Sequence, residues 1–143
     1  MKKHSLLPII FVAVLVLTLL SGCGNSSPVG KYYIKTIDGM PAEEYFISLQ
    51  KQAGDETPIK EIYKELGIKS AEEYITIEIK KDGTLITSLA GLSAEHQPSV
   101  GTWEQKDGKL LVTQENGAAV EVILNGKELI WPTDSGPYVY VKK

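Results

Sequence analysis

The chain has 143 residues, 43% of them hydrophobic, and a formal net charge of −3 at pH 7. It contains 15 lysines but no arginine. Arginine is the side chain that most often binds phosphate through two parallel hydrogen bonds. The absence of arginine and the negative net charge both argue against nucleic acid as a partner. A single cysteine excludes a disulfide framework within the chain.

The first residues have the order of features expected of a signal peptide. Lys2 and Lys3 give a positive start, and the 15 residues from Leu6 to Leu20 form an uncharged, largely apolar stretch. That stretch is shorter than the roughly 20 residues that a permanent membrane-spanning helix needs. We therefore predict a lipoprotein signal peptide over residues 1–22.

The signal peptide is followed by a motif for lipid attachment. Leu20-Ser21-Gly22-Cys23 resembles the lipobox of bacterial lipoproteins, in which an aliphatic residue and two small residues precede a cysteine. The resemblance implies cleavage between Gly22 and Cys23, and a diacylglyceryl group, with palmitate-like chains, on the Cys23 thiol. We expect a lipoprotein exported to the outer face of the cytoplasmic membrane in the cell envelope. The lysine-only composition and Gly24 favour a Gram-positive cell.

Residues 23–28 comprise this lipidated cysteine and a short flexible tether. The five residues from Gly24 to Pro28 are small or polar, and fully extended they reach about 17 Å at most. From Cys23 onward the chain has 13 lysines against 18 acidic residues, a net charge of −5. We therefore expect contact with the membrane through the lipid on Cys23 rather than through basic side chains.

Residues 29–143 are long enough for one compact domain. The segment 30–37 is rich in β-branched and aromatic residues and stops at the turn pair Asp38-Gly39, which predicts a first strand.

A helical insertion is predicted next, at about residues 41–67. It consists of two short helices, with Pro41 and Pro58 in their first turns and Thr57 as the N-cap of the second. Each helix is predicted to stop at a glycine in the left-handed conformation, namely Gly54 and Gly67.

From Tyr74 onward the apolar residues recur with a period of two, which is typical of strands with one buried face. Lys-Asp-Gly and Asn-Gly turns separate the apolar segments. Seven further strands are predicted, at 74–80, 84–90, 100–105, 109–114, 119–124, 127–131 and 138–142.

These patterns indicate a mainly β domain with a short helical pair. Short turns join sequence neighbours, and closure removes exposed edges, so we predict an eight-stranded antiparallel up-and-down barrel. The alternative is an open antiparallel sheet with the helices on one face.

The domain also carries motifs found in small lipocalin-like (calycin-type) domains of bacterial surface lipoproteins. Gly30-Lys31-Tyr32-Tyr33 opens the first strand, Gly101-Thr102-Trp103-Glu104 lies in the fourth, and Lys-Asp-Gly turns recur. The chain resembles that family, which implies an eight-stranded barrel, often of unassigned role and sometimes with an apolar internal site. Lipocalins proper have tryptophan where Tyr32 stands, covered by a basic residue late in the barrel.

Whether such a barrel holds a ligand depends on how far side chains fill its interior. With eight strands the barrel is either filled by its own side chains or admits one small molecule. Alternation directs Tyr32, Ile77, Trp103 and Trp131 inward, so we expect them to line any pocket. Its ligand would be apolar or neutral. A core filled by the aromatic rings is the alternative.

No catalytic group is expected. His96 is the only histidine beyond the signal peptide, and it lies in a polar loop near Ser93, Glu95 and Ser99. Serines and acidic residues are common near any surface histidine, so we interpret it as a solvated loop residue. The composition also predicts neither a metal site nor a cofactor.

Paired carboxylates do not change this interpretation. Glu78, Glu104 and Glu121 lie in mid-strand and alternate with apolar residues, which predicts that they point outward to solvent.

Two functions therefore remain. The first is a membrane-anchored module that binds a small apolar ligand in the barrel. The alternative is a tethered module for interaction with an envelope protein, with a filled barrel. A cavity would favour the first, and an exposed aromatic patch on Tyr45, Phe46 or Tyr63 would favour the second. An enzyme is not expected.

Overall fold

A computed structural model describes residues 27–91 and 98–143. The strands are β1 (Gly30–Ile37), β2 (Met40–Pro41), β3 (Ile75–Ile79), β4 (Thr84–Leu89), β5 (Ser99–Lys106), β6 (Lys109–Thr113), β7 (Ala119–Asn125), β8 (Glu128–Trp131) and β9 (Tyr138–Lys142). The helices are α2 (Ala42–Ala53), α3 (Ile59–Leu66) and the 3-10 helix η1 (Ala71–Glu73).

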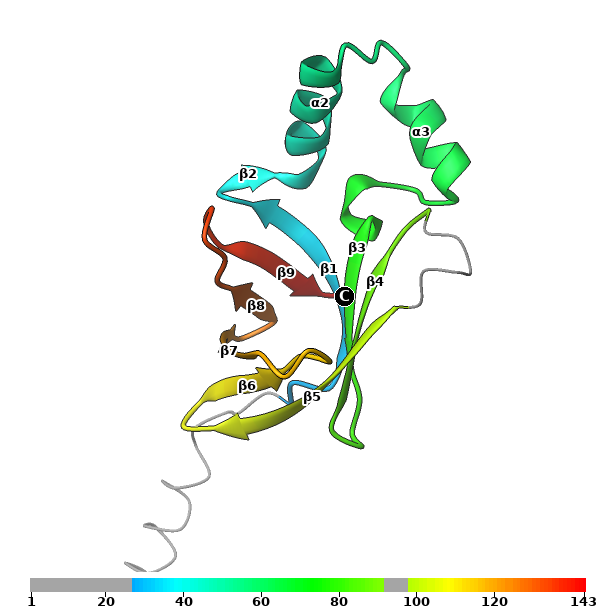
Figure 1. Ribbon diagram of the computed structural model, residues 1–143. Helices are drawn as coiled ribbons and strands as arrows, with labels where there is room; N and C mark the ends of the chain where they lie inside the picture. The colour runs from blue at the N-terminus through cyan, green and yellow to red at the C-terminus, as the bar shows by residue number, and fades with distance from the viewer. Residues whose placement is uncertain (1–26, 92–97) are drawn as a thin grey trace, which may run out of the picture.

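The strands form one antiparallel sheet in the order β2-β1-β3-β4-β5-β6-β7-β8-β9, and β1 also pairs with β9. This last pairing closes eight strands into a barrel, with β2 as a short addition to β1 (Figure 1). The predicted barrel is confirmed, and the open-sheet alternative is wrong because β1 and β9 meet along five residue pairs. The predicted helical pair is confirmed as well.

Short turns set the register of neighbouring strands. Lys106 pairs with Lys109, so Asp107 and Gly108 alone connect β5 to β6. Both have positive φ, 52° and 76°, as a two-residue turn requires if it is to match the right-handed twist of the strands.

The helices begin one residue later than predicted. Pro41 and Pro58 have extended backbone, with ψ of 139° and 132°, so each is the N-cap and not the first helical residue. Thr57 is therefore not the cap, and its backbone N–H donates instead to the Asp55 carboxylate (2.9 Å). The predicted stops are confirmed, because Gly54 and Gly67 both have left-handed backbone.

One irregularity in β1 changes which residues point inward. Ile34 pairs with Tyr140, but Thr36 pairs with the next residue, Val139, so β1 has one extra residue at Lys35. This β-bulge shifts the inward set of β1 by one position, and Ile37 is buried where strict alternation would bury Thr36.

The core fills the barrel over most of its length. The large side chains less than 2% exposed are Tyr32, Ile34, Ile77, Ile79, Leu110, Val112, Val122 and Leu129. Gly101 leaves room for the neighbouring strand, because a Cβ there would lie 2.7 Å from the Thr113 carbonyl oxygen.

The barrel has two unlike ends. The start of β1, the end of β9 and the hairpins β3–β4, β5–β6 and β7–β8 share one end, which we call the closed end. The other end receives the end of β1, the start of β3 and the β6–β7 turn. We call it the open end. Figure 1 shows α2 and α3 standing beyond the open end, away from the start of β1.

Candidate functional site

Aromatic side chains plug the closed end. Tyr32 is fully buried, and its hydroxyl donates to the Pro28 carbonyl (2.8 Å). Trp103 is half-buried against the core, and its indole N–H donates to the Lys80 carbonyl (2.9 Å). Hydrogen bonds to backbone carbonyls fix both side chains, so their rings occupy this end of the barrel.

Lys142 covers Tyr32 from the last strand. Its ammonium nitrogen lies 5.8 Å from the centroid of the Tyr32 ring and donates to the Ser27 carbonyl (3.0 Å). A cation over an aromatic face is attracted by the ring quadrupole. Lys142 therefore joins β9 to Tyr32 of β1 at the closed end. This contact and the closed eight-stranded barrel are compatible with a lipocalin-like fold.

The open end holds a cavity of about 300 Å³, which we call the cup. Residues from five strands and two connections converge on it: Ile75, Ile77, Thr87, Leu89, Ser99, Gln114, Trp131, Thr133, Tyr138 and Tyr140. Among these described residues none is charged. Mostly apolar walls with a few hydroxyl groups are typical of sites for small ligands.

Burial shapes the electrostatics of the cup. Tyr140 is 4% exposed, and burial, with a smaller contribution from the charge of Tyr138, raises the pKa of its phenol far above the usual value. The hydroxyl therefore stays neutral at all physiological pH values. A neutral wall favours a neutral or apolar group in the cup over a charged one.

A second apolar hollow, of about 280 Å³, lies between α2 and α3, and we call it the helix groove. Its described lining is Phe46, Leu49, Gln50, Ile59, Ile62, Tyr63, Leu66 and Tyr74. Phe46 packs edge-on against Tyr74, with ring centroids 4.6 Å apart. Leu66 lies against Gly91, where an added Cβ would be 2.2 Å from a Leu66 methyl carbon, so α3 is seated at the end of β4.

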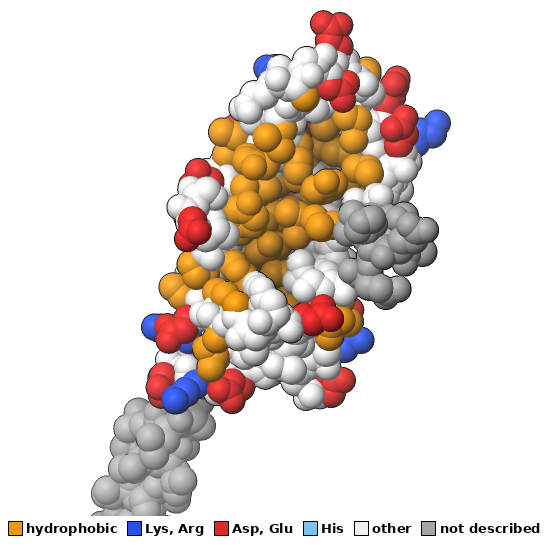
Figure 2. Space-filling view, viewed as in Figure 1, with side chains coloured by type: hydrophobic (Ala, Val, Ile, Leu, Met, Phe, Trp, Pro, Cys, Tyr) orange, Lys and Arg blue, Asp and Glu red, His pale blue; other side chains and the backbone are white. Residues whose placement is uncertain are grey.

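The groove and the cup belong to one apolar surface. Tyr74 lines the groove and the next residue, Ile75, lines the cup. Figure 2 shows hydrophobic side chains running without a break from the helices down into the hollowed part of the barrel, with acidic and basic side chains around the margin. Leu49 and Leu89, 42% and 43% exposed, are part of this surface.

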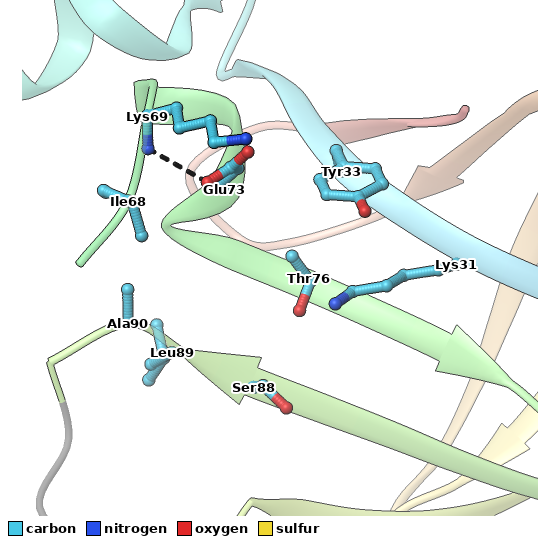
Figure 3. Close-up of a pocket in the computed structure, with 9 residues that line it drawn as sticks. All are labelled: Lys31, Tyr33, Ile68, Lys69, Glu73, Thr76, Ser88, Leu89 and Ala90. Atoms are coloured by element: carbon cyan, nitrogen blue, oxygen red, sulfur yellow. Dashed lines mark hydrogen bonds between the residues drawn. The ribbon is translucent and has the colours of Figure 1, made fainter. Parts of the chain in front are cut away.

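A third hollow, of about 400 Å³, lies outside the barrel on β1, β3 and β4 (Figure 3). Two of its charged groups already interact with the protein: Glu73 accepts the backbone N–H of Lys69 (3.0 Å), and the Lys31 ammonium lies 5.6 Å from the Tyr33 ring centroid. Because it lies on the outer wall with charged side chains at its margin, it is a weaker candidate than the cup.

The structure separates the four predicted ligand-binding residues into two pairs. Ile77 and Trp131 line the cup. Tyr32, which is the β1 partner of Ile77, and Trp103 are not among the lining residues, and both donate hydrogen bonds to backbone carbonyls at the closed end. The sequence analysis missed Thr87, Tyr138 and Tyr140. All three occupy inward-pointing positions of their strands, so alternation identifies them as interior residues. Alternation does not show at which end of the barrel they lie.

Other predicted features are placed in part. Glu78, Glu104 and Glu121 are exposed on outward positions, as predicted. Ser99 is at the rim of the cup, while Ser93, Glu95 and His96 lie outside the described residues. So do Gly22 and Cys23.

Within 27–91 and 98–143, no three His, Cys, Asp or Glu side chains are grouped to hold a metal ion. Over the same residues, no helix is long and apolar enough to cross a membrane.

Comparison with known proteins gives no match, whether against models of protein families, curated proteins or solved structures.

Proposed function

We propose that this chain is a membrane-anchored extracytoplasmic lipoprotein that binds a small apolar ligand in the cup. The observation that carries the proposal is the cup itself, a cavity of about 300 Å³ with uncharged walls at one end of an otherwise filled barrel. The anchor is supported by the signal segment and the lipobox-like sequence that ends at Cys23.

The structure also favours a ligand over a purely filled barrel. The aromatic rings that were expected to occupy the interior are divided between the ends, and only the closed end is plugged by them. No sequence rule for eight strands decides between a hollow and a filled barrel, and the position of the rings supports the ligand site.

The binding test uses N-phenyl-1-naphthylamine, a neutral apolar fluorophore, with residues 27–143. Thr87→Phe places a ring in the cup, whereas Thr102→Phe adds the same ring at an exposed outward position of β5. We expect Thr87→Phe to weaken binding at least about tenfold, equivalent to about 1.4 kcal/mol, and Thr102→Phe to leave it unchanged. Equal binding by both variants, or none by the unmodified protein, contradicts the proposal.

The anchor has its own test. Cys23→Ala removes the only thiol in the chain, so we expect the variant to lose the lipid and to leave the membrane fraction in a high-salt wash, while the unmodified protein stays. Mass spectrometry of the unmodified N-terminus should show the diacylglyceryl group. An unlipidated Cys23 would rule the anchor out.

An interaction with an envelope protein is the second candidate. The exposed Leu49 and the apolar helix groove favour it. The aromatic residues named for it do not, since Tyr63 is buried and Tyr45 and Phe46 are half-buried and pack on each other.

A further inference from the structure

We propose that the open end of the barrel faces away from the membrane that holds Cys23, so that the cup takes its apolar ligand from the aqueous side. This inference rests on the anchor and the ligand site proposed above.

The tether leaves the barrel at the closed end and is held there. Ser27 and Pro28 accept hydrogen bonds at their carbonyl oxygens from Lys142 (3.0 Å) and Tyr32 (2.8 Å). Tyr32 is fully buried, so its hydroxyl cannot swing away from Pro28 without opening the core. The barrel therefore holds the tether from Ser27 onward, and not only from the start of β1.

The chain between Cys23 and Ser27 is too short for the barrel to turn over. The four residue steps from Cys23 to Ser27 span about 14 Å at most. On β1, the seven steps from Gly30 to Ile37 rise about 23 Å along the strand, or roughly 17 Å along the barrel axis at the usual strand tilt. The helices α2 and α3 extend beyond that (Figure 1). With the anchor at the closed end, the tether cannot reach back past the open end, so the cup cannot be pressed against the bilayer.

The size of the cup agrees with a ligand from the aqueous side. About 300 Å³ is at the lower limit of small-molecule sites and suits one apolar chain or ring system. A membrane phospholipid has two chains and would leave one of them outside. The ligand class is therefore a water-dispersed amphiphile with a single apolar part, whose polar part stays at the rim near Ser99 and Thr133.

The test measures orientation with the two tryptophans, which lie at opposite ends. Trp131→Phe leaves Trp103 at the closed end, and Trp103→Phe leaves Trp131 at the cup. Full-length lipidated protein is placed in phospholipid vesicles with a dansyl acceptor on the lipid headgroup. We expect resonance energy transfer to the dansyl acceptor to quench the Trp103 emission more strongly than the Trp131 emission. Equal losses, or a greater loss from Trp131, overturn the proposal.

A tether variant tests the cause. About 20 glycine and serine residues inserted between Ser26 and Ser27 give a flexible chain with a reach of about 25 Å, enough for the barrel to turn. We expect the difference between the two tryptophans to shrink in this variant. An unchanged difference would show that tether length does not set the orientation.

A second set of vesicles tests the source of the ligand. Their phospholipid carries a nitroxide quencher on the acyl chain, which can reach Trp131 only if a membrane chain enters the cup. Quenching of Trp131 by this lipid overturns the proposal. The orientation test uses no ligand, so it stays informative if the fluorophore fails to bind, and Cys23→Ala reports separately on the anchor.

Discussion

Buried tyrosines make the barrel sensitive to alkaline pH at the scale of single residues. Burial raises the pKa of Tyr32 and Tyr140, and burial followed by the charge of Glu43 raises the pKa of Tyr63. In the unfolded chain a tyrosine ionises near pH 10. The folded protein thus keeps these phenols protonated at pH values where the unfolded chain has lost the protons.

This difference predicts the direction of the pH effect. A folded pKa above the unfolded pKa stabilises the protein fully below about pH 10, and the stabilisation is lost as the pH rises further. We expect the urea midpoint to fall steeply above about pH 10, and less steeply in Tyr140→Phe, which has no proton to lose there. Parallel curves for the two proteins would show that Tyr140 does not resist ionisation.

Tyr32 and Lys142 show what a family motif can and cannot predict at this scale. The position of Tyr32 follows from its place in the first strand. The identity of its covering cation does not, because Lys142 reaches the ring only through the closure of β1 on β9, more than a hundred residues away in the sequence. No local pattern distinguishes Lys142 from its neighbour Lys143, which pairs with Glu72.

At the scale of elements, the bulge at Lys35 is an extra residue in a strand whose flanking pairs are regular. Removing Lys35 would bring Ile34 and Ile37 two positions apart, which matches Tyr140 and Tyr138 on β9. The salt bridge that is lost with it, to Glu128, joins half-exposed side chains and contributes at most about 1 kcal/mol.

We therefore expect deletion of Lys35 to give a folded barrel, destabilised by about 1–3 kcal/mol. The matched deletion is Leu111, in the regular strand β6, where loss of one residue would turn Val112 or Leu110 outward and prevent folding. Urea unfolding and circular dichroism measure both. If the Lys35 deletion unfolds as completely as the Leu111 deletion, the bulge is itself required to close the barrel.

The sequence predicted the elements well where the signal is local. Period-two segments, the glycine stops of the helices and the two-residue turns each depend on neighbouring residues, and they are confirmed. β2 and η1 were missed because segments of two and three residues show no period. The bulge was missed because it exists only relative to the register of β9.

At the scale of the whole molecule, the pairing of β1 with β9, which we call the seam, makes the barrel one cooperative unit. Without β9, both β1 and β8 would have open edges, and Tyr140 would be missing from the core. The seam therefore contributes more to stability than its five residue pairs alone would suggest.

Truncation tests this cooperativity. We expect removal of residues 138–143 to abolish the cooperative thermal transition, because two strands lose their partners together. Removal of Lys143 alone deletes an exposed ion pair with Glu72 and should change stability by less than about 0.5 kcal/mol. A cooperative transition that survives the longer truncation would show that the remaining strands form a stable open sheet.

The site was predictable only in part, because its position depends on the geometry of the whole barrel. Alternation identifies the inward residues, but the division into a plugged end and a cup depends on how far each strand is staggered around the barrel. Trp103 and Trp131 have equivalent local patterns and lie at opposite ends.

The seam also determines when the barrel can close during synthesis of the chain. Ile37 must wait for Tyr138, so the barrel cannot close while the last strand is still on the ribosome. Until then β1 and β8 each lack one neighbour, whereas the strands from β3 to β7 already have both of theirs. The local hairpins can pair before that point, but the gap between β1 and β8 stays open until residues 138–142 are available. Closure of the barrel is therefore a late event in folding, which depends on β9 whichever hairpins have formed before it.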